Sequence, residues 1–374
     1  MSETLERLRS VGADGLSERL QEAGVSGAGG GGFPSYVKWE SLADARYLLV
    51  NHQESEPNCY LDKWIGREYA DELADLFEAL LAEHLECVVV GAKWTDRDPW
   101  LRPLEAAVDG TVYEPDDLPF DPEEATGVVF AYTEDTYEYG MENVLLRVST
   151  GTVIGKDLPV DYGWIVQNTE TVHDIYRALI EKRPVLRTHV HVDGLDADGK
   201  RLTHRLLDVP VGTSAADLLA AAGADTLSLP ADRVLLAGGP GWCFRVQRPP
   251  DRWGARKRTN CLLLFDEVLV SDNTYGNGRV NVLDTVDWVP SDPETEPTRI
   301  DPDRLHVPIV TNERYRDLVA PSTPTVGLGD GLERGQRLAD PTPVGDGFCV
   351  AHHAPVDGRV VDLTPREVEL RRTA

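Results

Sequence analysis

Short runs of consecutive apolar residues occur at regular intervals in the first half of the chain. They lie at Arg46–Val50, Cys87–Gly91 and Gly127–Tyr132, and again in the sequence GWIVQN at 163–168. Such runs, bounded by polar and glycine-containing segments, predict buried strands. Asn143–Val148 has a similar composition and predicts a further strand.

Apolar residues at helical spacing separate these runs. Residues 3–24 show a helical rhythm that breaks near Gly12, and Leu61–Leu85 carries one long apolar face. The sequence TVHDIYRALIEK at 171–182 predicts another helix directly after a strand. Alternating strands and helices favour an α/β domain with a mostly parallel sheet, which we expect at 1–185.

The pattern changes to short β segments after about Pro184. Within 186–288 we expect a small α+β module with one helix, capped by Ser214 and ended by Gly223. Prolines and charges at 289–303 predict a linker. Residues 304–374 are rich in β segments and glycine turns, which indicates a third, all-β module.

Composition narrows the possible partners and the cellular location. The chain has 374 residues and a net charge of −27, which argues against nucleic-acid binding. Seven of its 37 basic residues are lysines, which indicates a salt-adapted cytoplasm. The sequence lacks the features of a signal peptide and of a transmembrane span, so we expect membrane association only through a partner. Its five cysteines form no C-x-x-C motif.

The sequence GAGGGGFPSYVKW at 27–39 contains the spacing of a dinucleotide fingerprint. A helix rather than a strand precedes it, which argues against that fingerprint. A flexible linker fits poorly because an apolar, aromatic segment follows at once. The pattern favours a loop whose bare backbone N–H groups approach a ligand, with Lys38 supplying positive charge.

Two further segments carry polar residues at strand ends. Gln167–Thr171 lies between a strand and a helix, where Asn168 and Thr169 form either an anion site or an ordinary cap. Asn51–Pro57 follows the first strand of the sheet, at the end where ligands bind in α/β folds.

Together these three segments resemble the flavin-binding subunits of respiratory complex I, the C subunit of the Rnf complex and the cobalamin reductase of propanediol utilisation. The family pattern G-x-G-G-A-G-F-P-[TS]-x-x-K is matched from Gly27 to Lys38, and N-x-x-E-x-E-P from Asn51 to Pro57. The sequences YEYGMENVLLRVSTG and LPVDYGWIVQNTET are similar to further segments of the Rnf and cobalamin-reductase branch.

The resemblance extends over most of the chain and implies its architecture. It implies a Rossmann-like flavin domain, then a β-grasp module of the SLBB type at 186–288. Residues 304–374 resemble a lipoyl-type barrel-sandwich module without a modifiable lysine.

The sequence departs from its relatives between the second and third modules. Relatives carry C-x-x-C-x-x-C motifs there, whereas this chain has no cysteine in the corresponding segment. We therefore expect no iron–sulfur cluster and no metal site. The histidines His189 and His191 alternate with Asp193 on one predicted strand face, which a solvated surface explains better than a metal site.

The resemblance implies FMN as cofactor and NADH or NADPH as hydride donor. It places the following residues around the cofactor: Gly27, Gly29, Gly30, Gly32, Lys38, Asn51, Gln53, Glu54, Gln167, Asn168 and Thr169. Phe33, Lys38 and Glu56 would meet the nicotinamide nucleotide. Hydride transfer needs positioning more than a protein acid or base, so no catalytic side chain is expected.

The implied activity is an NADH dehydrogenase-like oxidoreductase that passes electrons to a separate acceptor, such as a ferredoxin or a cobalamin-related molecule. The missing cysteine motif favours an alternative, a non-catalytic interaction subunit with weak or lost flavin binding. A weaker third alternative is a ligand-binding role of the β-grasp module alone.

Overall fold

The computed structural model describes residues 3–196, 198–224, 231–288, 292–315 and 317–373. The chain divides into two compact units. The first comprises Met1–Gly27, Pro34–Ser55 and Tyr60–Arg183, and the second comprises Ala28–Phe33, Glu56–Cys59 and Pro184–Ala374. Two short segments from the N-terminal part of the sequence, which include most of the glycine loop, therefore belong to the second unit.

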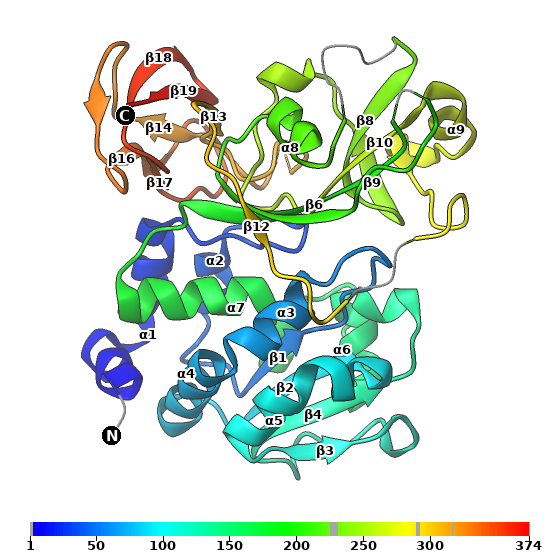
Figure 1. Ribbon diagram of the computed structural model, residues 1–374. Helices are drawn as coiled ribbons and strands as arrows, with labels where there is room; N and C mark the ends of the chain where they lie inside the picture. The colour runs from blue at the N-terminus through cyan, green and yellow to red at the C-terminus, as the bar shows by residue number, and fades with distance from the viewer. Residues whose placement is uncertain (1–2, 197, 225–230, 289–291, 316, 374) are drawn as a thin grey trace. The chain divides into compact units, whose positions relative to one another are not determined.

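A five-stranded parallel sheet organises the first unit (Figure 1). Its order is β3-β4-β2-β1-β5, so that β1 lies between β2 and the last strand of the unit. The strands are β1 (Tyr47–Asn51), β2 (Cys87–Lys93), β3 (Thr111–Tyr113), β4 (Gly127–Thr133) and β5 (Trp164–Asn168). This sheet confirms the predicted α/β class and four of the predicted strands.

Helices cover both faces of this sheet. The helix α4 contacts β2 and β4, and α3 and α5 pack beside it (Figure 1). The helices of the unit are α1 (Glu3–Ala23), α2 (Ser35–Trp39), α3 (Leu61–Glu68), α4 (Ala70–Glu83), α5 (Arg102–Val108), α6 (Glu142–Thr150) and α7 (Thr169–Tyr176). Gly12 has φ 66° and interrupts α1, as the broken rhythm predicted.

One helix prediction and one strand prediction were wrong in detail. The segment Leu61–Leu85 is two helices, because Tyr69 leaves helical geometry with φ −110° and ψ 32°. The predicted strand at Asn143–Val148 is part of α6 instead. Leu145 and Leu146 are completely buried against the sheet core, and Gly151 ends the helix with φ 72°. A short apolar run fits a buried helix turn as well as a strand, so periodicity alone misassigned it.

The second unit is built on a seven-stranded mixed sheet with the order β11-β9-β8-β10-β6-β7-β12. Its long strands are β6 (Arg187–Gly194), β7 (Arg205–Pro210), β8 (Arg233–Gly239), β9 (Trp242–Arg245) and β10 (Cys261–Asp266). The central pair, β6 and β10, is parallel, and antiparallel hairpin strands flank it. Leu218 and Leu219 of helix α8 (Ala215–Ala221) pack into the core of this sheet. This arrangement is a β-grasp fold, as the resemblance implied.

Local signals in this module were predicted correctly, with one exception. The Ser214 hydroxyl caps α8 by accepting a hydrogen bond from the Asp217 N–H, and Gly223 follows the helix with φ 88°. A helix α9 (Glu267–Asp272) follows β10, and β11 is Arg279–Val280. The exception is the predicted linker at 289–303, because β12 (Thr298–Arg299) pairs with β7 and extends the sheet. Of that stretch, 289–291 lie outside the described residues.

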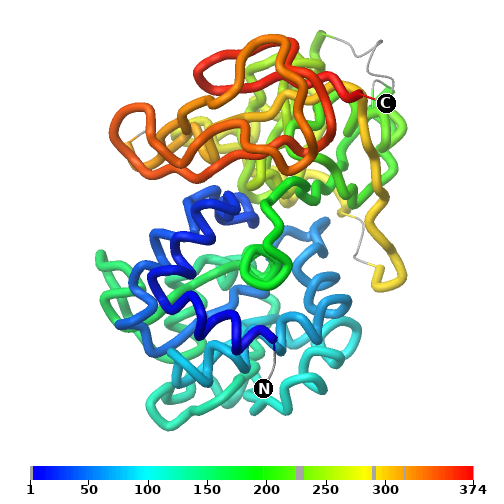
Figure 2. The backbone as a smooth tube through the Cα atoms, turned by 90° about the vertical axis from the view of Figure 1, so that its left-hand side faces the viewer, coloured from blue at the N-terminus to red at the C-terminus, as the bar shows by residue number. Residues whose placement is uncertain are grey.

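The C-terminal strands form two small sheets, traced in orange and red in Figure 2. One contains β13 (Arg304–Pro308), β19 (Glu367–Arg372), β18 (Gly358–Thr364) and β15 (Gly331–Leu332), and the other β14 (Ser322–Pro324), β16 (Arg337–Pro343) and β17 (His352–His353). Side chains from both sheets share one core, including Leu305, Leu338 and Leu370. This is the β module expected at the end of the chain. Among the described residues, we find no helix with the length and hydropathy needed to cross a bilayer.

Candidate functional site

The carboxyl ends of β1 and β5 meet where the strand order of the first sheet reverses. Asn51 is the register partner of Asn168, and Val50 is the partner of Gln167. The chain leaves β1 toward β2 on one side and returns as β5 on the other side. Such a switch point leaves a crevice outside the strand ends, which is where α/β sheets bind ligands. Three of the predicted cofactor residues therefore lie at one place.

Lys38 is anchored at the β5 side of this switch point. Its Nζ atom donates to the Val166 carbonyl and to Glu142 Oε2, both at 3.0 Å. The side chain keeps 27% of its surface exposed. The ammonium group is thus held in place and remains accessible to an anion.

Asn51 joins β1 to the segment before α6. Its Nδ2 atom donates to the Gly140 carbonyl at 2.8 Å, while its Oδ1 atom accepts the Gln53 N–H at 3.2 Å. A side chain at Gly140 would place Cβ 2.2 Å from Ser55 Oγ. Gly140 is therefore needed for the close approach of these two loops.

Gln53 is completely buried, and its amide is directed toward the end of β4. Its Nε2 atom donates to Thr133 Oγ1 at 3.1 Å. Sequence reasoning gave Gln53 only a cofactor role, yet the structure gives it a partner within the protein.

The N-terminus of α7 is capped by two side chains. Asn168 is the N-cap residue and accepts the Thr171 N–H at 3.3 Å. Asp62, from the first turn of α3, accepts the Glu170 N–H at 3.0 Å and also contacts the Asn168 amide. The predicted anion position at this helix end therefore already has a protein carboxylate beside it. Sequence reasoning missed Asp62, because nothing local in the sequence links α3 to α7.

Glu54 has a left-handed backbone with φ 38° and caps α3. Its Oε2 atom accepts the Asp62 N–H at 2.5 Å. Burial raises the pKa of Glu54 to about 7, and the hydrogen bond from Asp62 opposes this shift. Burial and the neighbouring carboxylates Glu54 and Glu170 likewise raise the pKa of Asp62. The site thus contains carboxylates that are costly to ionise together.

His52 is a second residue that sequence reasoning missed. It has no exposed surface, and its Nδ1 atom lies 2.8 Å from Thr169 Oγ1. Burial lowers its pKa to about 3, with Lys63 adding to the shift. The neutral ring therefore positions Thr169 at the start of α7. Its only sequence signal was its place between two predicted site residues.

Gln167 carries a buried donor that lacks a partner. Its Nε2 atom is buried and has no hydrogen-bond acceptor within the described part of the chain. An unpaired buried amide N–H costs about 1–3 kcal/mol. The group lies at the carboxyl end of β5, next to the strand end that carries Asn51. A ligand atom that accepts a hydrogen bond there would remove this cost.

Most of the glycine loop belongs to the second unit and is held there by its carbonyl groups. Arg258 Nη1 donates to the Gly30 carbonyl at 3.2 Å, and Asn312 Nδ2 donates to the Gly31 carbonyl at 2.6 Å. The N–H groups of Gly29, Gly31 and Gly32 have no acceptor among the described residues. These free donors agree with a ligand-binding loop. Gly27 ends a segment of the first unit.

Of the three residues predicted to meet the nucleotide, Lys38 lies in the first unit, and Phe33 and Glu56 lie in the second. The ring of Phe33 makes an edge contact with Phe348, with centroids 5.9 Å apart. Glu56 Oε2 accepts the Gly241 N–H at 2.8 Å, in the turn between β8 and β9. Glu56 thus has a partner within its own unit.

The strand face that carries His189, His191 and Asp193 is not a solvated surface, so that interpretation was wrong. His191 is 1% exposed and Asp193 is fully buried. Asp193 Oδ2 pairs with Arg201 Nη2 at 2.9 Å. The strand lies inside the mixed sheet between β7 and β10, which the alternation of polar residues did not reveal.

Comparison with known families matches residues 20–177 to the Nuo51 FMN-binding domain. This stretch contains every residue discussed above for the first unit's strand ends.

The chain is similar to the cobalamin reductase PduS of Salmonella typhimurium, with 32% identity over 233 residues that cover 62% of this chain and 46% of the relative. It is also similar to the C subunit of the ion-translocating oxidoreductase complex of Vibrio cholerae, with 29% identity over 69% of this chain and 31% of the relative. The chain thus spans less than half the length of these curated relatives. A chain of an NAD⁺-reducing [NiFe]-hydrogenase has a similar fold, with a TM-score of 0.52 and 20% identity over 71% of this chain and 48% of that one.

Proposed function

Residues 20–177 match the Nuo51 FMN-binding domain, and from this similarity we propose that the protein is a flavin-dependent oxidoreductase. It would take hydride from NADH or NADPH onto FMN and pass the electrons to a separate acceptor. The observation that carries the proposal is the unpaired, buried Gln167 amide at the switch point of the parallel sheet. The similarity to a cobalamin reductase and to a component of an oxidoreductase complex supports the reaction class.

The residues present fit FMN, because the strand ends offer donors to an anionic, acceptor-rich ligand. Gln167 has a free N–H donor, and Lys38 holds an accessible positive charge close to β5. Bound FMN would supply a ring that accepts a hydride and releases electrons one at a time. In this proposal Lys38, Asn51, Gln53, Glu54, Gln167, Asn168 and Thr169 hold it.

The chain's own residues would orient the ligand rather than move protons. Asn51 fixes the loop at Gly140 beside the strand end, and His52 positions Thr169. The free N–H groups of Gly29, Gly31 and Gly32 would bind further acceptor atoms of the cofactor or nucleotide, and Gly27 and Gly30 would shape the loop. Phe33 would stack on the nucleotide, and Glu56 would meet its ribose. Hydride transfer depends on such positioning.

We place the acceptor outside this chain. The segment in which relatives carry cluster-binding cysteines has none here, so the proposal includes no iron–sulfur cluster. A ferredoxin, a cobalamin-related molecule or a component of a larger complex would take the electrons. The similarity to one component of an ion-translocating complex favours assembly with partner subunits, and any association with a membrane would come through them.

We also propose a role for each domain of the chain and a cellular location for the protein. A flavin domain at 1–185 would be followed by a β-grasp domain at 186–288 and a barrel-sandwich domain at 304–374, with the latter two serving partner contacts. The acidic, lysine-poor composition favours the cytoplasm of a salt-adapted organism.

An absorption spectrum tests the proposal. The full chain is purified in high salt, mixed with FMN, desalted and then treated with NADH or NADPH without oxygen. Flavin bands that survive desalting and bleach with the nucleotide are expected. Folded protein that retains no flavin would overturn the proposal and leave the non-catalytic interaction subunit as the better account.

A further inference from the structure

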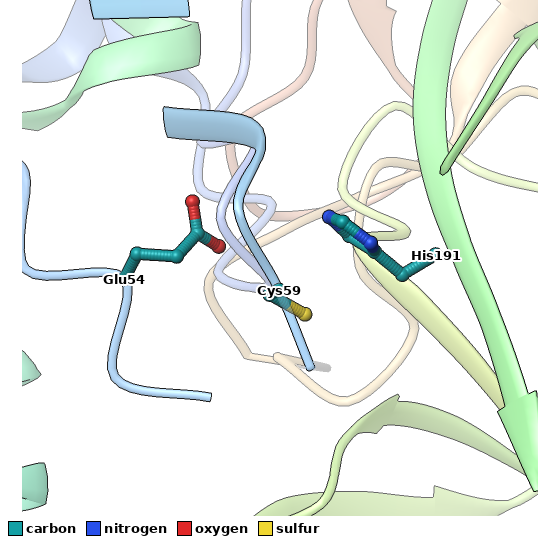
Figure 3. A group of neighbouring side chains, drawn as sticks. All are labelled: Glu54, Cys59 and His191. Atoms are coloured by element: carbon teal, nitrogen blue, oxygen red, sulfur yellow. The ribbon is translucent and has the colours of Figure 1, made fainter. Parts of the chain in front are cut away.

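Two short segments within the stretch 20–177 belong to the second unit. These segments are Ala28–Phe33, which contains most of the glycine loop, and Glu56–Cys59. The Cys59 thiol lies within 4.8 Å of a ring nitrogen of His191 on β6, and Figure 3 shows both side chains. Residues from the later part of the chain therefore surround segments that the family match assigns to the FMN-binding domain.

The side chain of Arg258 lies along the glycine loop. Its Nη1 atom donates to the Gly30 carbonyl at 3.2 Å. Gly32 has φ 66°, and a Cβ atom at this position would clash with Arg258 Cδ. Arg258 itself lies in a closed turn, in which the Thr259 hydroxyl accepts the Arg256 N–H at 2.9 Å. The arginine side chain is thus held against the loop.

Asn312 holds the next carbonyl group of the loop. Its Nδ2 atom donates to the Gly31 carbonyl at 2.6 Å, and its Oδ1 atom accepts the Arg314 N–H at 3.0 Å. The second bond fixes which end of the Asn312 amide faces the loop. Asn312 is buried, so water does not compete for these bonds.

The two carbonyl bonds determine where the N–H groups of the loop point. The C=O and N–H groups of a planar trans peptide point in opposite directions, and these peptides are trans. The Gly30 carbonyl faces Arg258, so the Gly31 N–H of the same peptide points away from Arg258. The Gly31 carbonyl faces Asn312, so the Gly32 N–H points away from Asn312. A Cβ atom at Gly31 would meet no other described part of the chain within 4 Å, so the loop has an open side.

Positive charge lies behind these donors. Burial and the neighbouring arginines Arg256 and Arg314 lower the pKa of Arg258 to about 10, so Arg258 remains charged at neutral pH. Glu313 Oε1 pairs with Arg256 Nη2 at 3.1 Å, and the Arg258 charge has no carboxylate partner among the described residues. A cation bonded to a carbonyl oxygen polarises the peptide and strengthens its N–H as a donor. The loop therefore suits an anionic group.

We propose that Arg258 and Asn312 are positioning residues, which direct the N–H groups of the glycine loop toward a phosphate group of the ligand. Both residues lie outside the stretch 20–177, so ligand binding would depend on a part of the chain that the family match does not include. The identity of the ligand rests on the proposed function, and both FMN and the nicotinamide nucleotide carry phosphate. The second unit would thus contribute to ligand binding as well as to partner contacts.

The variants R258M and N312A test the proposal in the full chain. Quenching of flavin fluorescence measures FMN affinity, and reduction of ferricyanide with FMN in excess measures kcat and KM for NADH and NADPH. Each variant is expected to weaken FMN binding or to raise the nucleotide KM by about tenfold or more, with little change in kcat. R258K keeps a charged donor and should stay within about threefold of the original chain. A fall in FMN affinity would identify the cofactor phosphate as the ligand group, and a rise in KM alone would identify the nucleotide phosphate.

Two control variants remove similar bonds elsewhere in the second unit. Arg372 Nη1 donates to the Asp301 carbonyl at 3.1 Å. Asn273 Nδ2 donates to the Leu269 carbonyl at 2.9 Å. R372M and N273A should therefore change neither FMN affinity nor KM. Melting curves establish that each variant folds.

Hydrogen exchange on flavin-free protein separates this inference from the proposed function. The exchange of residues 24–35 reports on the loop, because the Gly30 N–H bonds to the Ala28 carbonyl at 2.6 Å and the Ser35 N–H to the Val25 carbonyl at 3.1 Å. Exchange should be at least about threefold faster in R258M and N312A, and unchanged in the two controls.

An original chain that binds no FMN would contradict the proposed function, while the exchange measurement would still test how the loop is held. The inference is overturned if folded R258M and N312A exchange as slowly as the original chain. It is also overturned if both variants keep the original FMN affinity and nucleotide KM.

Discussion

Asn51 and Asn168 lie opposite each other as register partners at the carboxyl ends of β1 and β5. They are far apart in the sequence, yet both use their side chains to organise the same end of the sheet. Asn51 bonds to the Gly140 carbonyl, and Asn168 caps α7 and contacts Asp62. The switch point is therefore built from loops that are cross-linked by amide groups, with the Gln167 donor left open.

The variant Q167L tests the unpaired Gln167 amide through two effects, one on stability and one on FMN binding. Replacing an unpaired buried amide with an apolar side chain is expected to stabilise the flavin-free protein by about 1 kcal/mol. The same change should weaken FMN binding about tenfold, because one hydrogen bond to the ligand is lost. Chemical denaturation and quenching of flavin fluorescence measure the two effects.

The exposed residue Gln247 provides the control for this prediction. Q247L should change neither quantity appreciably. A loss of FMN affinity as large in Q247L as in Q167L would contradict the assignment.

Removal of the Asp62 carboxylate is expected to destabilise α7 and its contacts with α3. In D62A the Glu170 N–H loses its acceptor, which should lower the free energy of unfolding by about 1–2 kcal/mol. D62N keeps an acceptor and removes the charge that is costly beside Glu54 and Glu170, so its loss should be smaller. Urea denaturation of both variants provides the measurement, and equal losses would argue against a role of the acceptor.

The buried, neutral His52 ring predicts a loss of stability in acid. Its folded-state pKa is about 3, below the usual value of 6.5, so the unfolded chain binds more protons between these two pH values. The contribution of His52 to stability is therefore expected to fall as the pH drops below about 6.5. His52 alone should contribute a loss of about 2 kcal/mol between pH 7 and pH 5.

H52Q removes this contribution while retaining a polar side chain of similar reach. Relative to the original chain, H52Q should gain about 2 kcal/mol of stability between pH 7 and pH 5, as measured by denaturant unfolding at each pH. Parallel curves for the two proteins would show that His52 is not the group responsible.

Glu54 is expected to affect the pH dependence of stability with the opposite sign to His52. Its folded-state pKa is about 7, above the usual value of 4.5, so the folded protein binds the additional proton in this range. The contribution of Glu54 to stability should therefore decrease as the pH rises from about 4.5 to 7, by an amount on the order of 2 kcal/mol. E54Q, which stays neutral, should lack this decrease when flavin-free protein is melted at pH 5 and pH 8. A variant that loses stability as steeply as the original chain would refute the assignment.

The fold class and several local signals could be predicted because they depend on short-range chemistry. The apolar runs around Leu48, Val89 and Phe130 form the strands expected, and Ser214 caps α8. The run around Leu145 was misassigned, because a buried helix turn and a buried strand have the same composition.

The sequence by itself determined which side chains follow each strand, since a polar residue after an apolar run is a local property of the chain. It therefore placed Asn51, Gln167 and Asn168 at strand ends. Tertiary structure decided which polar groups near these strand ends have partners. Asp62 of α3 accepts a hydrogen bond from α7, and Gln53 donates to Thr133. The buried Gln167 amide N–H has no acceptor within the described part of the chain. It also brought His204 to His191 within the second unit. Such pairings depend on how distant segments pack and on which polar groups lose contact with water when they are buried. Neither can be deduced from the sequence of a short segment.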